Sequence, residues 1–207
     1  AWDLDQVEIL RGPQSTQQGR NALAGAIIIT TKDPVFDDEY RARVEVGNRG
    51  STRLAFSGNT QLIDDSLALR FTAEHFETDG FITNTLLNQN AGAQDVTTYR
   101  AKLRWRPNDR FDAVLSYSFT ANEGGENSIV GSDPAGPYQV AFDLPNVNAA
   151  KQSIWGLKTI YDLSDTWQLE TETNFFENDQ RIFVTSDGFL NTQAPTLAPS
   201  SLQLTDN

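Results

Sequence analysis

The feature that most constrains this fold is a strict alternation of apolar and polar side chains, which recurs along the chain after Glu39. In the first such segment, Tyr40, Ala42, Val44 and Val46 take one parity, and Arg41, Arg43 and Glu45 take the other. Successive side chains of a strand point to opposite faces, so the segment is predicted to be a β-strand with one apolar face. Six more segments repeat the pattern: 52–59, 67–74, 99–106, 111–120, 155–161 and 167–175. The chain is therefore predicted to be all-β and antiparallel.

The connections between these segments alternate in length. Tight polar turns are predicted at 63–66, 106–110 and 162–166, whereas 77–97, 121–151 and 176 onward are rich in Asn, Gly, Asp and Pro and are predicted to be long loops. Among the connections at the loop end, only 48–50 is short. Short turns at one end and long loops at the other are typical of outer-membrane barrels.

Hydropathy and aromatic placement agree with such a barrel. No run of about 18 apolar residues occurs, which excludes a membrane-spanning helix but not spanning strands, because a barrel strand shows lipid only every second residue. Aromatic residues are predicted to form two girdles, with Tyr40, Trp105, Phe111, Tyr161 and Trp167 near the turns and Phe76, Tyr99, Phe119, Phe175 and Phe176 near the loops. The alternative is that these aromatics fill the core of a soluble β-sandwich.

Composition excludes several functions. The net charge of -12 opposes nucleic-acid binding, since phosphate backbones attract basic surfaces. The absence of cysteine excludes disulfides and thiolate metal sites, and the single histidine, His75, disfavours a catalytic triad or a histidine metal cluster. The chain opens without the basic and apolar regions of a signal peptide, so we expect the natural N-terminus to be missing.

Residues 1–34 lack the alternation of apolar and polar residues that marks the rest of the chain. A short apolar strand at 7–10 precedes a Gly/Pro/Ser/Thr/Gln loop, and the β-branched run at 26–31 is predicted to be a strand buried on both faces. The acidic, proline-containing segment 32–39 is predicted to be a linker. The glycines Gly12, Gly19 and Gly25 permit positive φ or close backbone approach, and Pro13 fixes a turn.

The strings VEILRGPQST at 7–16 and GRNALAGAIIITTK at 19–32 closely resemble the end of the plug domain of TonB-dependent outer-membrane receptors. The plug-motif residues are Glu8, Arg11, Gly12, Pro13, Gly19, Arg20, Asn21 and Gly25, and the chain departs from the usual pattern at Gln17 and Gln18. The resemblance implies that 1–34 form the C-terminal part of a plug and 35–207 the N-terminal part of a transmembrane β-barrel, with about 7 of about 22 strands.

The resemblance also implies a function. The expected protein is a receptor in the outer membrane of a Gram-negative bacterium, where it binds a scarce nutrient, with a ferric siderophore favoured, and imports it with energy from TonB. Expected partners are outer-membrane lipid, the ligand, and TonB through a missing N-terminal box; no cofactor, metal or enzymatic activity is expected. The alternatives are a passive porin-like barrel and a soluble β-sandwich ligand-binding module. Upstream we expect a signal peptide and roughly 100 plug residues, and downstream about 15 strands, by subtraction from about 22.

Two sets of candidate site residues follow. By resemblance, Arg11 is the plug arginine that pairs with barrel carboxylates, for which Glu45, Glu74, Glu170 and Glu172 have the inward parity; the alternative is a solvated turn arginine. A basic inward wall either attracts anionic ferric chelates or hydrogen-bonds the plug and lumen water. The hypothesis of hydrogen bonding to the plug and to lumen water is favoured. The wall residues are Arg41, Arg43, Arg53, Arg70, Arg100, Lys102, Arg104, Arg106 and Lys158.

Three weaker patterns in the sequence do not support a phosphate loop, a glycosidase or a calcium site. The glycines at 12–19 lack the Gly-Lys-Ser/Thr of a phosphate loop. Glu170 and Glu172 share one strand face, as a glycosidase pair could, but a polar lumen explains them more simply. The acidic loop residues Glu123, Glu126, Asp133 and Asp143 lack the ligand spacing of a calcium site.

Overall fold

The computed structural model describes residues 2–12, 25–124, 138–141, 144, 147–185 and 201–206. Strands make up all of the regular secondary structure in these ranges. No helix of the described residues is long and apolar enough to cross a membrane.

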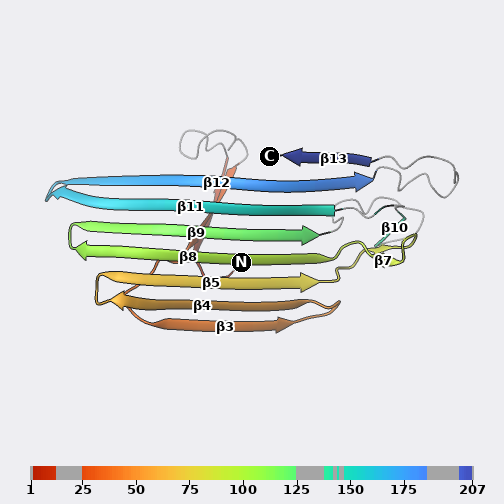
Figure 1. Cartoon of the computed structure of the whole chain (residues 1–207), viewed down its shortest axis with the longest axis horizontal. Coiled ribbons are helices and arrows are strands. Elements are labelled where there is room, and N and C mark those ends of the chain that lie inside the picture. Colours follow the sequence, from red (N-terminus) through yellow and green to blue (C-terminus); the bar gives the residue numbers. More distant parts are fainter. Residues whose placement is uncertain are drawn as a thin grey trace.

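One antiparallel sheet of eight strands dominates the molecule (Figure 1). Its strand order is β13-β12-β11-β9-β8-β5-β4-β3, so strands that are consecutive in this set are also neighbours in the sheet. The strands are β3 (Glu39–Val46), β4 (Thr52–Ile63), β5 (Leu67–Thr78), β8 (Gln94–Asn108), β9 (Phe111–Gly124), β11 (Val147–Ser164), β12 (Trp167–Thr185) and β13 (Ser201–Asp206). The seven alternating segments lie within β3, β4, β5, β8, β9, β11 and β12, which confirms the all-β prediction.

The register gives the sheet two chemically distinct faces. Residues directly opposite each other on paired strands share a face. Phe71 lies opposite Gly58 and Ala101, and its neighbour Arg70 lies opposite Asn59 and Lys102. We call the side that carries Phe71 the outer face and the side that carries Arg70 the inner face. The outer face is apolar and uncovered, with Leu54, Phe56, Leu115, Trp155, Leu157 and Leu169 among its exposed side chains.

Aromatic side chains form two belts on the outer face. Near the tight turns the ring centroids of Trp105 and Phe111 lie 5.5 Å apart, and Phe111 and Tyr161 lie 6.2 Å apart. Towards the other end Tyr117 packs on Trp155 at 4.4 Å. Trp155 and Tyr161 are separated by about 20 Å along β11 at about 3.3 Å per residue, which is close to the apolar height of an outer-membrane barrel.

Phe76 and Phe176 do not belong to the outer belts. Phe76 lies opposite Arg53, whose guanidinium sits 4.4 Å from the ring centroid, and Phe176 lies opposite Ile154 on the inner face. The prediction that these two residues join the girdle near the loops is therefore wrong, because their parity along the strand places them inside.

The strands extend further than the alternation predicts. β8, β9, β11 and β12 contain 15, 14, 18 and 19 residues and extend into the segments 77–97, 121–151 and 176 onward. At these ends polar residues such as Asp95 and Glu123 take the outer face too, so pairing continues after the hydrophobic alternation stops. β13 pairs with β12 inside a segment predicted to be loop, and the alternating leucines at 202 and 204 are the signal that was overlooked.

The two ends of the sheet differ as predicted. Tight turns join β4 to β5, β8 to β9 and β11 to β12, all at the same end (Figure 1). At the opposite end β6 (Thr83–Asn84), β7 (Gln89–Asn90) and β10 (Gln139–Val140) form a small separate sheet, in which β10 pairs with β6 in parallel. Ile82 and Val140 are buried against each other beside this sheet, with Ala91 packed on them.

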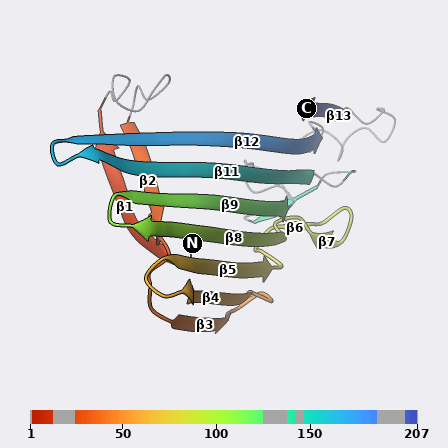
Figure 2. The same ribbon diagram turned by 60° about the vertical axis from the view of Figure 1, so that its left-hand side comes forward.

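The N-terminal residues form an antiparallel hairpin of β1 (Leu4–Arg11) and β2 (Gly25–Thr31), which crosses the large sheet on one side (Figures 1 and 2). Gly25 has φ +144, and a Cβ atom there would lie 2.4 Å from the carbonyl oxygen of Leu10. The side chains of Ile9 and Ile27 are 68% and 69% exposed. The prediction of a strand buried on both faces is therefore wrong in this chain, because a two-stranded sheet leaves its far face uncovered.

Candidate functional site

The N-terminal hairpin is fastened to the inner face by a buried ion pair next to its first strand. Arg70 on β5 donates to Asp3 from Nε at 2.7 Å and from Nη2 at 2.6 Å, and Thr72 Oγ1 lies 3.4 Å from the same carboxylate. The two side chains are only 4% and 3% exposed. A bidentate arginine–carboxylate pair of this kind is directional and is screened little by solvent.

Asp3 itself is held in its charged form. Burial alone would raise the pKa of Asp3, but the hydrogen bonds and the charge of Arg70 outweigh it, and the pKa is lowered. Asp3 also has a positive φ of 59°, a conformation that few residues other than glycine adopt, although aspartate does so more readily than most. The surrounding contacts therefore hold an uncommon backbone geometry in place.

The preceding residue, Trp2, is held by two arginines. Arg100 on β8 donates from Nη2 to the Trp2 carbonyl oxygen, and the guanidinium of Arg43 on β3 lies 4.6 Å from the centroid of the Trp2 ring. Residues from β3, β5 and β8 thus hold the start of the hairpin.

The segment after the hairpin is held along the same face. Lys102 Nζ donates to the Thr31 carbonyl at 2.9 Å and to Asp33 Oδ1 at 2.7 Å. Arg104 Nη1 donates to the Pro34 carbonyl at 3.3 Å, while its Nε lies 3.0 Å from both carboxylate oxygens of Asp112. The segment predicted to be a linker is therefore docked on the sheet.

Phe36 in this segment contacts two cations. The guanidinium carbon atoms of Arg104 and Arg106 lie 5.5 Å and 4.5 Å from its ring centroid. Cation–π contacts of this length favour a fixed ring position between the two side chains.

Asn59 on β4 is the residue at this interface that sequence reasoning overlooked. Its side chain accepts from Val35 N at 3.1 Å and donates to the carbonyl oxygens of Val35 and Asp37 at 2.7 Å and 2.5 Å. The residue is 1% exposed. An asparagine at an inward position is the only sequence signal, since its three partners lie more than 20 residues away and are backbone atoms that no motif marks.

The structure places the nine predicted wall cations on the inner side of the sheet, where eight have a neighbour of opposite charge or an acceptor and Arg106 lies over the ring of Phe36. Besides the contacts above, Arg41 lies 3.8 Å from Glu39, Arg43 lies 3.3 Å from Glu45, and Lys158 lies 2.7 Å from Glu170. Arg53 lies 3.2 Å from Glu45 and also pairs with Glu74. Attraction of anions to this wall stays a prediction.

The four carboxylates expected to receive Arg11 all have neighbours on their own sheet. Glu45, Glu74 and Glu170 pair with the cations just named, and Glu172 accepts from Asn174 Nδ2 at 3.0 Å. Arg11 ends β1, opposite Gly25. Its pairing with these carboxylates stays a prediction, as do the roles of Glu8 and Gly12. Pro13, Gly19, Arg20 and Asn21 lie outside the described residues.

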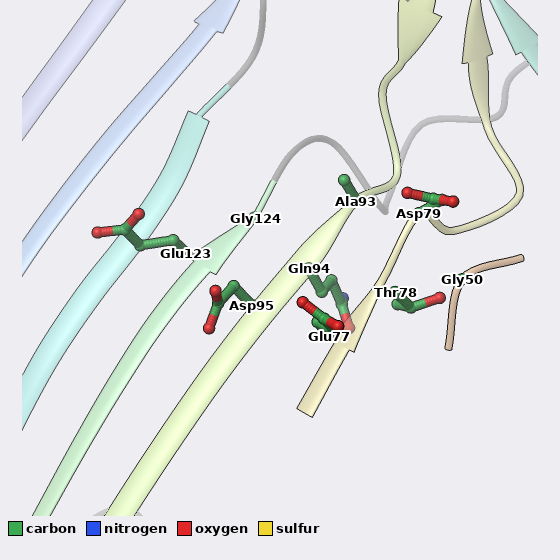
Figure 3. Close-up of a pocket in the computed structure, with 9 residues that line it drawn as sticks. All are labelled: Gly50, Glu77, Thr78, Asp79, Ala93, Gln94, Asp95, Glu123 and Gly124. Carbon is green, nitrogen blue, oxygen red and sulfur yellow. The ribbon is translucent and has the colours of Figure 1, made fainter. Parts of the chain in front are cut away.

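Acidic residues gather at the edge of the sheet where β5 and β9 end and β8 begins. A depression of about 540 Å³ is lined by Glu77, Asp79, Asp95 and Glu123, together with Gly50, Thr78, Ala93, Gln94 and Gly124 (Figure 3). His75 lies beside it, with Nδ1 2.9 Å from Thr97 Oγ1 and 3.5 Å from Asp95. In Figure 3 the carboxylates spread along the rim instead of converging, and no group of three or more metal ligands occurs in the ranges that the structure describes. Glu126, Asp133 and Asp143 lie outside those ranges.

In sequence the chain is similar to receptors for ferrioxamine and for pesticin. It is 20% identical over 189 residues to the ferrioxamine receptor of Yersinia enterocolitica, covering 87% of this chain and 26% of that protein. It is 34% identical over 115 residues to the pesticin receptor of Yersinia pestis, covering 52% of this chain and 16% of that protein. The chain thus spans about a quarter or less of these curated relatives. No family model matches it.

Comparisons of structure show the same fold. The ferric yersiniabactin uptake receptor of Yersinia pestis superposes with a TM-score of 0.76 at 24% identity, covering 87% of this chain and 29% of that one. A ferric-catecholate import receptor from Escherichia coli, in its closed form, gives 0.75 at 17% identity, covering 98% and 31%. The predicted partial barrel is confirmed at the level of the fold.

Proposed function

We propose that this chain is a segment of a TonB-dependent outer-membrane receptor of a Gram-negative bacterium. The whole protein then binds a ferric siderophore and imports it with energy from TonB. The ligand binds on the loop side, and TonB pulls on a segment upstream of Trp2. No covalent chemistry is required of the chain.

The observation that carries this proposal is the hairpin docked across the inner face. A passive porin needs an open, water-filled interior, whereas here residues 2–3 and 31–37 are bound to β3, β4, β5 and β8 through Arg43, Asn59, Arg70, Arg100 and Lys102. An internal segment held by polar contacts can be retained at rest and withdrawn under force. This arrangement favours a gated transporter over an open pore.

The outer face supports a membrane location and opposes the soluble alternative. A β-sandwich buries the apolar face of each sheet against a second sheet. In the described part of this chain the hairpin lies on the inner side, and no element covers the outer face, where Trp155 and Leu157 are 48% and 44% exposed. We infer that lipid contacts this face. The two aromatic belts then lie at the two membrane–water interfaces.

We assign residues 1–34 to the end of the plug and residues 35–207 to the beginning of the barrel. The segment between β2 and β3 is the natural boundary, because the pairing partner changes there from β1 to β4. The exposed Ile9 and Ile27 side chains are then covered by the rest of the plug.

Uptake measurements test the proposal. The full-length protein is expressed in cells that lack their own siderophore receptors, and uptake of iron-55 is followed with ferrioxamine B or ferric yersiniabactin, the ligands named for its relatives. We expect accumulation of at least one chelate in cells that contain TonB and none in cells without it. Equal uptake with and without TonB would indicate a passive pore. A lack of uptake of any ferric siderophore would contradict the proposed ligand class.

A further inference from the structure

We infer that Arg70, Thr72 and Arg100 form a carboxylate-binding site on the inner face, which Asp3 occupies in this state and which a carboxylate-bearing ligand takes when residues 2–3 withdraw. The withdrawal rests on the proposed function, whereas the site itself does not. The chain thus carries its own substitute ligand at a position that its cargo would reach later.

The geometry around Asp3 is that of a binding site for a small anion. Arg70 presents two donors to the carboxylate at 2.7 Å and 2.6 Å, and Thr72 adds a hydroxyl at 3.4 Å. The planar fork of arginine matches a carboxylate in both spacing and direction. Both Arg70 and Asp3 are almost fully buried while they are paired, so water is kept away from the two donors as long as a carboxylate fills the site.

Arg100 shows that Asp3 does not use all the donors in this cluster. Its Nη2 atom donates to the Trp2 carbonyl, while its Nε atom is buried and has no hydrogen-bond partner within the described structure. Leaving a buried donor without a hydrogen-bond acceptor costs free energy. A ligand with more acceptor atoms than one aspartate side chain could satisfy it.

Withdrawal of the N-terminal residues changes the charge of this part of the wall. Arg70 lies opposite Lys102, and Thr72 lies opposite Arg100, so the three cations are adjacent on neighbouring strands. Asp3, which is hydrogen-bonded to Arg70, leaves with residues 2–3, whereas Asp33 stays hydrogen-bonded to Lys102. Glu39 remains 3.5 Å from Arg70, and Glu74 remains paired with Arg53. The exposed patch is therefore cationic.

The site is closed while Asp3 is in place. The cavity bounded by Asp3, Thr31, Lys32, Arg70, Thr72, Arg100 and Lys102 has a volume of about 10 Å³, which is no more than one water molecule requires. A free carboxylate therefore enters only when Asp3 leaves or is removed by substitution.

Chemical rescue tests the site in the full-length receptor, without any siderophore. Asp3→Gly removes the carboxylate, and glycine suits the positive φ at this position. We expect the thermal unfolding midpoint of Asp3→Gly to rise by about 3 °C or more when sodium acetate replaces sodium chloride at constant ionic strength, because a ligand that binds only the folded state stabilises it. The wild-type receptor, whose site is filled, should not respond.

Two further variants isolate the site. Arg70→Gln in the Asp3→Gly background should abolish the response to acetate, and Glu170→Ala, which opens an exposed pair with Lys158, should show none. No response in Asp3→Gly, or an equal response in the wild type, would overturn the inference. If Asp3→Gly does not assemble stably, the yield of folded receptor after refolding with acetate or with chloride gives the same comparison. These readouts do not involve transport, so they can fail while siderophore uptake succeeds, and the reverse.

Discussion

Asn59 allows a test of how the segment after the hairpin is held, because one buried side chain satisfies three of its backbone groups. The bonds join Asn59 to Val35 N at 3.1 Å, to the Val35 carbonyl at 2.7 Å and to the Asp37 carbonyl at 2.5 Å. Asn59→Ala removes all three. At about 1 kcal/mol of net stabilisation per hydrogen bond, the docked state of this segment should lose about 3 kcal/mol.

That free energy is about a hundredfold change in the opening equilibrium, since about 1.4 kcal/mol corresponds to a factor of ten. The backbone amide of Val35 reports it directly, because Asn59 Oδ1 is its acceptor. We expect hydrogen exchange at this amide in the full-length protein to accelerate by about a hundredfold. Amides in the centres of β8 and β9 should be unaffected, because the loss is local.

A matched control uses the same substitution on the same face. Asn174→Ala removes an exposed side chain that donates to Glu172 at 3.0 Å, and exchange at Val35 should not change. Asn59→Asp should accelerate exchange at least as much as Asn59→Ala, because a carboxylate would then face the two carbonyl oxygens. If Asn59→Ala changed Val35 exchange by less than about threefold, Asn59 would not be the main anchor, and Lys102 and Arg104 would hold the segment instead.

Three other outcomes follow from the geometry. Gly25→Ala should destabilise the hairpin by about 2 kcal/mol or more, since its Cβ would meet the Leu10 carbonyl at 2.4 Å, and unchanged exchange protection of the β1 amides would contradict this. The lowered pKa of Asp3 means that its attachment is complete above its ordinary value of 3.8 and is lost only as the pH falls below that value; acid titration of hairpin protection should show this step in the wild type and not in Asp3→Gly. Leu157→Lys on the outer face should cost about 2–4 kcal/mol of folding free energy in lipid vesicles, whereas Asn174→Lys on the inner face should cost about 1 kcal/mol or less, and equal costs in urea titrations would contradict the assignment of faces.

The sequence predicted the wall strands well because one physical rule governs their centres. Within the apolar belt each strand must present carbon to one side and polar atoms to the other, so the period of two is visible in every segment. Beyond the belts that requirement ends. Asp95, Glu123 and Glu177 continue the pairing with polar residues on the outer face, and composition alone made these extensions resemble loops.

The site was harder to predict because its contacts join distant parts of the chain. Parity identified Arg70, Arg100 and Lys102 as inward cations, but Asp3, the carboxylate that Arg70 grips, lies 67 residues away and outside any recognised motif. The expected ion pair ran from a hairpin arginine to wall carboxylates. That pair stays a prediction, and the Asp3–Arg70 pair, in which the acid precedes the hairpin and the arginine is on the wall, is an additional one that the sequence did not indicate.

The small sheet of β6, β7 and β10 limits how this protein can be altered at its loop end. Ile82 and Val140 come from different connections, and each finds its buried apolar neighbour in the other, while Thr83 N and Thr85 N donate to the carbonyls of Tyr138 and Val140. Grafting either connection alone into another protein would leave Ile82 or Val140 exposed to water and would break the parallel pairing. The unit that can be exchanged with another protein of this fold is therefore the pair of connections, and a redesign of this end must alter both together.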